Sequence, residues 1–446
     1  MRLALLYPKD TAGLYTPKLI RYLIEKDYEY EKDPEKADYI LVTLPTLFNI
    51  EWLKKIREKY KNKKIIAGGH WTQANPYPAL AYVDYINTGE GFEFFRDLKD
   101  NSIDDLPYVL SKKRDVIRNS EFIDWQNCPV IQESKQSYRY WYSQGCRYKC
   151  SFCSTSWNHK FQKNPTDIRL VMSKIKGKNS LNIIANEYFD TPSALNMKSI
   201  DVTVRAYIKE PRKFAWIKTG VEATTEEVRR FFRKPVTQAE LQEFVEIVHK
   251  RLQNTKIFMI AGLESEESWM KFLEIIPEAK EKEFTFAVII NYLGPSAGTP
   301  LQFMDMRDIK QLDFNKIFYK FKRKNANIRF YGENASLVRE HIHTLVERTN
   351  LENIEKVMEV RKRVLTGKIK RLDEFFEECY RLGLDKEVEG DTNIKLVPGA
   401  YRDLLQQQTK SILQKEWEEL RIEKKKIRDN INSIGKIKGE VLGNRT

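Results

Sequence analysis

Short apolar runs alternate with amphipathic stretches in the first part of the chain, and this alternation limits the folds that are open to it. In chain order, the predicted strand, helix, strand, helix and strand are residues 3–7, 15–26, 37–42, 48–60 and 64–70. Buried strands that alternate with helices are typical of βαβ units and of a parallel sheet. We therefore predict an α/β chain with a Rossmann-like parallel sheet over residues 1–110. The pair Gly68-Gly69 lies at its predicted carboxyl edge, where open α/β sheets bind ligands.

A second series of strand and helix patterns follows residues 111–136, which we interpret as a connector. The predicted strands of this series are residues 138–142, 181–185, 214–218, 257–262 and 284–291. Polar residues and glycines follow these strands, as in β/α barrels, whose chemistry lies at the carboxyl ends of the strands. We predict a partial (β/α)6 TIM-type barrel over residues 137–310. Only about 30 residues separate Asp190 from Gly220, so we expect a shortened crossover there, with residues 200–206 as the strand in between.

The composition indicates a globular protein, because the chain has 446 residues, of which 41% are hydrophobic and 12% aromatic. The formal net charge is +14, and basic chains bind nucleic acids or anionic surfaces. Lys, Asn and Ile are frequent throughout, however, so nucleic acid is one open partner class and no more. The five cysteines do not have the spacing of a disulfide framework, and no apolar run has the length of a membrane span. We therefore expect a cytoplasmic protein with no membrane partner.

Three of the five cysteines lie close together, as Cys146, Cys150 and Cys153 in the spacing C-x3-C-x2-C. A [4Fe-4S] cluster takes one thiolate on each iron that the protein anchors, so three thiolates leave one iron open to another ligand. The alternative is a structural zinc site with His159 as the fourth ligand. Zinc sites more often combine C-x2-C with a distant second pair, which this chain lacks. The other two cysteines are solitary, so a second cluster is not expected.

The cysteine spacing, with the aromatic Phe152 just before the third cysteine, resembles the cluster loop of the radical S-adenosylmethionine (radical SAM) enzymes. The resemblance implies that the open iron binds the amino and carboxylate groups of S-adenosylmethionine. It also implies that one electron, from an external donor such as flavodoxin or ferredoxin, splits the sulfonium to a 5′-deoxyadenosyl radical. That radical abstracts hydrogen from a substrate, which the sequence does not identify.

The acidic residues after the cysteine loop resemble the radical SAM core in their order. Family members bind the methionine amino group at the end of the second strand, which implies Glu187 here, with Asp190 behind it. Glu222, in the run Gly-Val-Glu-Ala, matches an element near the ribose and the methionine carboxylate. A single acid of this kind is more often a helix cap or an exposed loop residue, so the order of these residues carries the interpretation.

Two further positions are implied by the same resemblance, both near the adenine. Residues 260–266 are similar to the glycine-containing strand end that lies against adenine, which implies Gly262 and Glu266 as cofactor-binding residues. Phe152 is expected to place its backbone beside the edge of the adenine. No catalytic residue beyond the cofactor ligands is assigned.

About the first 100 residues resemble the cobalamin-binding-type domain that precedes the barrel in a large radical SAM subfamily. Members that hold cobalamin through a histidine carry D-x-H-x-x-G after the first strand, whereas this chain has no histidine before His70. Two outcomes stay open: the fold is retained without cobalamin, which the missing motif favours, or cobalamin binds without a protein imidazole. Bound cobalamin would favour methylation, and its absence would favour another radical modification. We interpret His70 itself as a polar residue at a strand end.

Residues 311–446 are predicted to form a basic helical region. The expected helices are residues 333–349, 351–366, 372–382 and 401–430, the last with a dense Lys/Arg face. A solvated helix face is the commoner meaning of such charge. Two rival hypotheses therefore stand beside the radical SAM enzyme: a nucleic-acid-binding protein with a structural Fe-S or zinc site, and a regulatory scaffold with a degenerate barrel.

Overall fold

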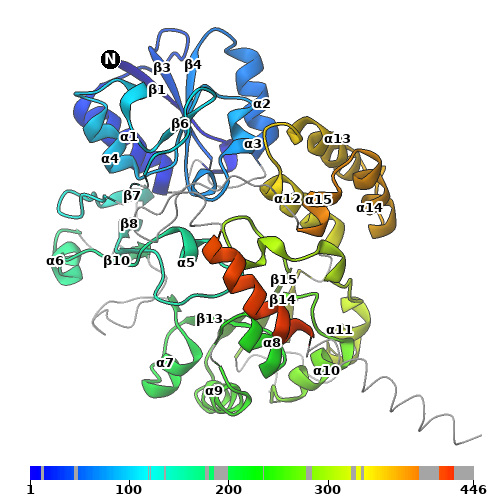
Figure 1. The fold of residues 1–446 in the computed structure, drawn as a ribbon. Coiled ribbons are helices and arrows are strands. Elements are labelled where there is room, and N and C mark those ends of the chain that lie inside the picture. Colours follow the sequence, from blue (N-terminus) through cyan, green and yellow to red (C-terminus); the bar gives the residue numbers. More distant parts are fainter. Residues whose placement is uncertain are drawn as a thin grey trace, which may run out of the picture.

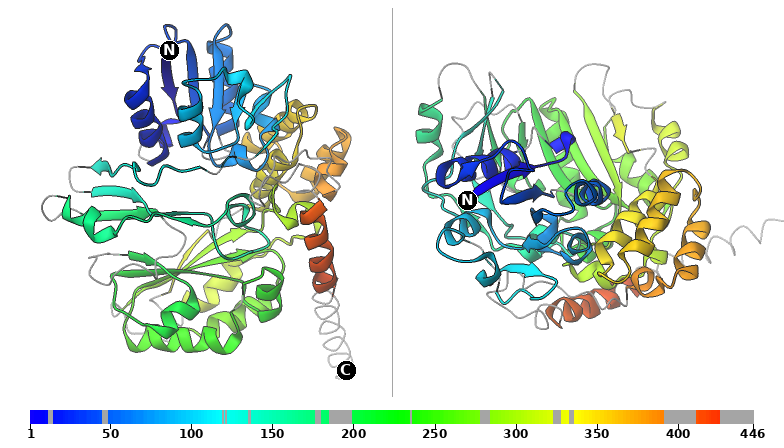
Figure 2. Two further views of the ribbon diagram at one scale, coloured as in Figure 1. Left: turned by 60° about the vertical axis from the view of Figure 1, so that its left-hand side comes forward. Right: turned by 90° about the horizontal axis from the view of Figure 1, so that it is seen from above.

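The computed structural model describes most of the chain. The described residues are 1–11, 15–44, 49–118, 120, 122–134, 137–175, 180–184, 199–234, 236–277, 284–322, 328–332, 336–390 and 411–425. One sheet with its helices lies at one end of the molecule, and a second group of strands and helices lies at the other (Figures 1 and 2). A bundle of helices from residues 337–389 lies beside the first sheet.

The N-terminal part forms a six-stranded sheet in the order β2-β1-β3-β4-β5-β6. Its strands are β1 (Arg2–Leu6), β2 (Glu29–Tyr30), β3 (Tyr39–Thr43), β4 (Lys64–Gly68), β5 (Tyr85–Asn87) and β6 (Val109–Ser111). The first five strands are parallel, and β6 pairs antiparallel with β5. The central strands are apolar on both faces because helices cover both faces. The parallel sheet predicted from the alternating pattern is confirmed.

Four helices of the N-terminal part pack on this sheet (Figure 1). They are α1 (Tyr15–Asp27) and α4 (Gly91–Asp97) on one face, and α2 (Ile50–Lys59) and α3 (Tyr77–Leu80) on the other. In α1, Leu19 and Leu23 are one helical turn apart and are at most 5% exposed. Burial of one such leucine stabilises the fold by about 2 kcal/mol.

The face with α2 and α3 shares its core with helices from far along the chain. These helices are α12 (Leu337–Arg348), α13 (Ile354–Leu365), α14 (Leu372–Arg381) and α15 (Asp385–Glu389). Glu355 of α13 links the two parts, because it pairs with Lys54 at 2.8 Å and accepts a hydrogen bond from Tyr82 Oη at 2.9 Å. The sequence predicts α12, α13 and α14 within a few residues, but it does not predict α15 and gives no sign of where these helices pack.

The remaining strands form two larger sheets and one short ladder. One sheet has the order β11-β8-β7 and consists of β7 (Ile131–Ser134), β8 (Ser137–Trp141) and β11 (Ser180–Ile184). The other is parallel throughout and consists of β12 (Ser199–Asp201), β13 (Trp216–Glu222), β14 (Thr255–Ala261), β15 (Phe286–Tyr292) and β16 (Ile328–Tyr331). Within the described residues the strands form no closed barrel, so the TIM-type barrel stays a prediction. Strand β16 extends the parallel sheet beyond residue 310, where the predicted barrel ends.

Helices cover the outer side of the parallel sheet (Figure 2). The helices of this half are α5 (Ser154–Asn158), α6 (Ile168–Ser173), α7 (Val204–Lys209), α8 (Glu226–Phe231), α9 (Gln238–Lys250), α10 (Glu266–Glu274) and α11 (Phe314–Lys322). The strand predicted over residues 200–206 is wrong in its second half, because α7 begins at Val204. The side chain of Thr203 accepts a hydrogen bond from the Ala206 backbone N–H at 3.2 Å and caps this helix.

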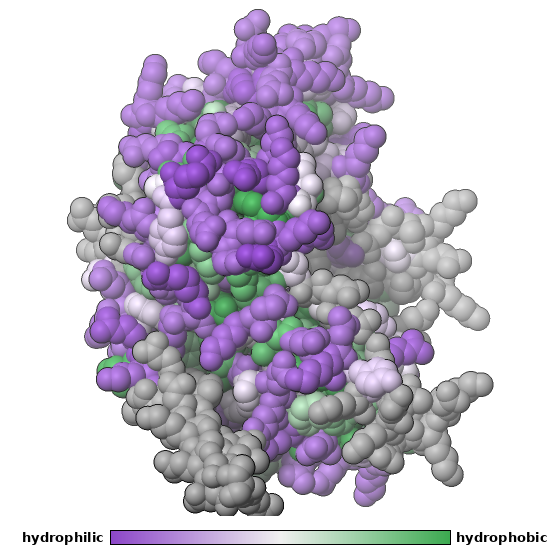
Figure 3. All heavy atoms as spheres, turned by 90° about the vertical axis from the view of Figure 1, so that its right-hand side faces the viewer, coloured by the Kyte–Doolittle hydropathy of each residue, from purple (hydrophilic) through white to green (hydrophobic). Residues whose placement is uncertain are grey.

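The surface on the side of α13 and α14 is mostly hydrophilic, and apolar side chains show only in small separate spots (Figure 3). Within the described residues, no helix combines the length and the apolar character that crossing a membrane requires.

Candidate functional site

The cysteine loop follows the carboxyl end of β8 and is held at its base by a short antiparallel ladder. Strand β9 (Ser143–Gln144) pairs with β10 (Gln162–Lys163), so the chain leaves and returns at one point. Gly145, which follows β9, has a φ of 69°. A Cβ at Gly145 would lie 2.4 Å from the carbonyl oxygen of Lys160, so this position requires glycine.

The three cysteines are gathered on this loop. Cys150 is 6% exposed, whereas Cys146 and Cys153 are partly exposed. Burial raises the pKa of the Cys150 thiol to about 12; Lys234 opposes this shift, and the neighbouring thiols add to it. Among the described residues, no three His, Cys, Asp or Glu side chains are grouped as ligands of a single metal ion. The thiolates of a [4Fe-4S] cluster each bind a different iron, so they do not have to converge on one point.

Hydrogen bonds fix the backbone around the second and third cysteines. The Cys150 carbonyl accepts from Trp157 Nε1 at 2.9 Å and from the Cys153 backbone N–H at 3.2 Å. Helix α5 begins directly after Cys153, and Ser156 in its first turn donates to the Cys153 carbonyl at 2.8 Å. The loop therefore turns tightly and holds the cysteines close to one another.

The end of α8 anchors the loop from the other side. Ser151 donates twice, from its backbone N–H to the Phe232 carbonyl at 3.2 Å and from Oγ to the Phe231 carbonyl at 2.9 Å. The ring of Phe152 packs edge-on against Phe232, with centroids 5.2 Å apart. The Phe152 side chain therefore fixes the loop in place, while the role of its backbone near an adenine stays a prediction.

Glu222 ends β13 and forms an ion pair beside the cysteines. Its Oε1 lies 3.3 Å from Nζ of Lys234, and its φ is 70°, a left-handed conformation rare outside glycine. A side chain at Gly220 would collide with this carboxylate, since a Cβ there would lie 1.9 Å from Oε1. Burial raises the pKa of Glu222, and Lys234 opposes that shift. Burial lowers the pKa of Lys234, but Glu222 and Cys150 outweigh it, so this pKa is raised and the lysine stays charged.

The backbone after Glu222 is held by a second buried acid, Glu264. Its carboxylate accepts hydrogen bonds from the backbone N–H groups of Thr224 at 2.9 Å and Thr225 at 2.6 Å, and from Thr225 Oγ1 at 2.8 Å. Burial raises the pKa of Glu264, and these hydrogen bonds oppose the shift. Glu264 lies in the segment predicted to contact adenine, but its contacts give it the task of positioning the Glu222 loop.

The other predicted cofactor residues lie in different surroundings. Gly262 has a φ of 119°, and a Cβ there would lie 2.4 Å from Cγ2 of Ile309, so a packing contact already requires glycine. Glu266 opens α10 and pairs with Lys316 of α11 at 3.1 Å, so its carboxylate faces α11. These contacts do not bring Glu266 to the cysteine loop. Glu187, with Asp190 behind it, lies outside the described residues.

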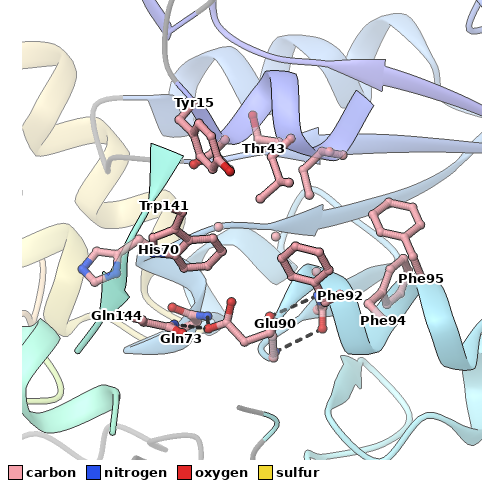
Figure 4. Close-up of a pocket in the computed structure, with 18 of the residues that line it drawn as sticks. Tyr15, Thr43, His70, Gln73, Glu90, Phe92, Phe94, Phe95, Trp141 and Gln144 are labelled. Carbon is pink, nitrogen blue, oxygen red and sulfur yellow. Dashed lines mark hydrogen bonds between the residues drawn. The ribbon is translucent and has the colours of Figure 1, made fainter. Parts of the chain in front are cut away.

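A cavity of about 420 Å³ lies between the cysteine loop and the carboxyl edge of the N-terminal sheet (Figure 4). This volume is in the range of small-molecule sites. One side of the cavity is aromatic, with the ring of Trp141 6.3 Å from Tyr15 and 6.4 Å from Phe92 between centroids. Gly145 and Thr155 bring the cysteine loop into its wall. None of the described residues that line it is a lysine or an arginine.

The opposite wall is polar and joins the two halves of the molecule. Glu90 accepts hydrogen bonds from Gln73, at 3.3 Å, and from Gln144 of β9. Gln144 Nε2 also lies 2.9 Å from Nδ1 of His159, whose ring stacks on that of His70 with centroids 5.5 Å apart. Burial lowers the pKa of His159 to about 3 and also lowers that of His70. Both imidazoles are therefore neutral at pH 7.

Sequence reasoning missed several residues that this arrangement brings together. His70 lies at a strand end, as expected, but it also faces the cysteine loop through Thr155 Oγ1, 3.5 Å from its Nε2. Lys234 follows a helix in a run of basic residues, and nothing in that run separates it from a solvated lysine. Glu90 and Gln144 belong to different halves of the chain, so only the tertiary structure reveals their contact.

No protein-family model matches the chain, and no curated protein matches it. Among solved structures, the cobalamin-dependent S-adenosylmethionine radical enzyme OxsB with aqua-cobalamin bound is similar over 98% of this chain and 81% of its own, at 11% identity and a TM-score of 0.49. The radical S-adenosylmethionine methyltransferase TsrM from Kitasatospora setae, with cobalamin and a [4Fe-4S] cluster bound, is similar over 67% of this chain and 76% of its own, at 12% identity and a TM-score of 0.46. These values describe a distant likeness, so the assignment of a function rests on the residues of this chain.

Proposed function

We propose that the chain is a radical SAM enzyme, in which Cys146, Cys150 and Cys153 hold a [4Fe-4S] cluster. One observation carries this proposal. The three thiols lie on one loop after β8, next to the ion pair between Glu222, the last residue of β13, and Lys234. Opposite charges beside an iron-sulfur cluster with an open iron suit a zwitterionic cofactor, and S-adenosylmethionine carries an amino and a carboxylate group.

The thiol loop fits a cluster in its chemistry. Thiolates are the ligands of iron-sulfur clusters, and Lys234 favours the thiolate form of Cys150. Cys150 is buried, and its carbonyl accepts a hydrogen bond from Trp157 Nε1, so this part of the loop excludes water. When bound, the cluster supplies the electron that cleaves the sulfonium and an open iron for the methionine group. Exclusion of water protects a radical from quenching.

The ion pair has a specific task in this proposal. Lys234 binds the methionine carboxylate through its ammonium group, and Glu222 accepts hydrogen bonds from the ribose. Glu264 fixes the backbone of the Glu222 loop, so the carboxylate stays in place before the cofactor arrives. The proposal also includes the residues that the motif order implies. Glu187 binds the methionine amino group, and the adenine is contacted by Phe152, Gly262 and Glu266.

The cavity is the proposed place of the substrate, because it separates the cysteine loop from the N-terminal sheet. Its described lining holds no lysine or arginine to neutralise phosphates, which favours an uncharged or cationic substrate over a nucleic acid.

The carboxyl edge of a Rossmann-like sheet also suits a corrinoid, bound without a protein imidazole at the first strand. With cobalamin the reaction is a methylation, and without it another radical modification.

Electron paramagnetic resonance tests this function. The protein is reconstituted anaerobically with iron and sulfide, reduced with dithionite, and measured with and without S-adenosylmethionine. We expect the signal of a reduced [4Fe-4S] cluster that changes shape when S-adenosylmethionine is added. A signal that S-adenosylmethionine leaves unchanged would contradict the open iron and support a structural cluster.

A further inference from the structure

Residues 411–425 form a helix, which we name the C-terminal helix, that lies between α5 and α8 (Figure 1). Its apolar side faces the second half of the molecule. Leu413 packs with Trp157 of α5, and Trp417 and Leu420 belong to the core of the parallel sheet and its helices. The helix is therefore docked by burial of large apolar side chains, and it reaches the cysteine loop from about 260 residues farther along the chain.

Two carboxylates of the C-terminal helix, those of Glu416 and Glu419, meet at one residue, Arg233. Its guanidinium pairs with Glu416 and, at 3.5 Å, with Glu419, and it lies 5.8 Å from the ring centroid of Trp157. Arg233 also has a φ of 55°, a conformation that residues other than glycine rarely adopt. Surrounding contacts must hold such a backbone in place, and the two carboxylates of the helix are well placed to do so.

Two of the residues that the helix contacts, Arg233 and Trp157, lead directly to the cofactor site. Arg233 immediately precedes Lys234, whose Nζ lies 3.3 Å from Glu222. The backbone N–H of Lys234 donates to the Arg229 carbonyl at 2.8 Å, so the turn that holds Arg233 also sets the direction of the Lys234 side chain. Trp157, on the other side, donates to the Cys150 carbonyl at 2.9 Å.

We propose that Glu416 and Glu419 of the C-terminal helix are positioning residues for the cofactor site. They hold Arg233 in its left-handed turn, and this turn directs Lys234 at Glu222 and at the thiols. The effect on S-adenosylmethionine rests on the proposed function, whereas the mechanical link from the helix to Lys234 does not. The basic C-terminal segment thus uses its acidic residues to complete a site formed far away in the sequence.

The test compares two changes on the same helix in the full-length, reconstituted protein. The double substitution Glu416→Gln and Glu419→Gln removes both carboxylates that hold Arg233. Glu418→Gln is the control, because Glu418 is half exposed and pairs with Arg421 of its own helix at 3.4 Å. Equilibrium dialysis measures the affinity for S-adenosylmethionine, and iron analysis checks the cluster. We expect the double variant to bind about five- to tenfold more weakly with unchanged iron, and the control to stay within twofold. Equal affinities of double variant and wild type, or an equal loss in the control, would overturn the proposal.

A second measurement needs no cofactor and so separates this inference from the proposed function. Urea unfolding is measured for Lys234→Met in the wild-type background and in the double-variant background. Lys234→Met changes the equilibrium constant of unfolding by some factor in each background. If the helix directs Lys234, this factor is at least threefold smaller in the double-variant background than in the wild-type background. Equal changes in both backgrounds would refute the link, even if neither protein binds S-adenosylmethionine. Coupling without any binding of S-adenosylmethionine would support the link and count against the proposed function.

Discussion

Acidification should destabilise the shared core of α12 and the N-terminal sheet, because His341 is buried there in neutral form. This histidine is fully buried, and its ring packs against those of Phe375 and Phe376. Burial, and then the charge of Arg348, lower its pKa from 6.5 to about 3. Because this pKa is lowered in the folded state, His341 of the unfolded chain takes up a proton first as the pH falls. The stability is therefore intact above pH 6.5 and decreases below pH 6.5. From pH 6.5 to pH 5.0 the loss is about 2 kcal/mol, at about 1.4 kcal/mol per pH unit.

The assay is urea denaturation of wild type and His341→Leu at pH 7.5 and pH 5.0. Leucine fills a similar volume and does not titrate, so the variant should lose about 2 kcal/mol less than wild type over this range. Ile342→Val is the matched control, since Ile342 is the next buried residue of α12 and has no titratable group. It should cost about 1 kcal/mol at both pH values. A parallel loss in wild type and His341→Leu would refute the reasoning.

Three further changes probe the cysteine loop and its neighbours. Cys150→Ala should abolish cluster binding and activity, yet lower the free energy of unfolding by only about 1 kcal/mol. Unchanged iron content in this variant would contradict the cluster assignment. Gly145→Ala should destabilise the loop by about 2 kcal/mol or more, because its φ is positive and the new Cβ would collide with the Lys160 carbonyl. A variant with wild-type stability and iron content would contradict this backbone conformation. Lys234→Met should weaken S-adenosylmethionine binding about tenfold, or about 1.4 kcal/mol, with the reduced cluster still formed, whereas unchanged affinity would remove Lys234 from the cofactor site.

Local patterns predicted those parts of the fold that depend on residues close in sequence. The helices α1 and α2 and the strands β1, β3 and β4 follow from apolar runs and helical spacing, and the structure confirms them within a few residues. The predicted strand at residues 200–206 fails because one threonine, Thr203, caps a helix inside a run of β-branched residues. Pattern alone does not weigh a cap against strand propensity.

Contacts between distant segments could not be predicted from the sequence. The stack of His70 on His159 joins residues from the two halves, and Lys234 reaches Glu222 only through the turn after α8. The partner of Glu266 is of the same kind, because its carboxylate pairs with Lys316 of α11, 50 residues farther along the chain, while its contact with the adenine stays a prediction. The spacing of the cysteines predicts that they lie on one loop. Only the tertiary structure shows that the charged side chains of Glu222 and Lys234 lie next to them.

The central claim is that the cysteine loop binds a [4Fe-4S] cluster that cleaves S-adenosylmethionine. The most direct test reconstitutes the protein anaerobically with iron and sulfide, adds dithionite and S-adenosylmethionine, and quantifies iron and 5′-deoxyadenosine by mass spectrometry. It needs no substrate. The account predicts about four irons per chain and formation of 5′-deoxyadenosine, both lost in Cys150→Ala. Zinc in place of iron, or a full cluster that forms no 5′-deoxyadenosine, would contradict it.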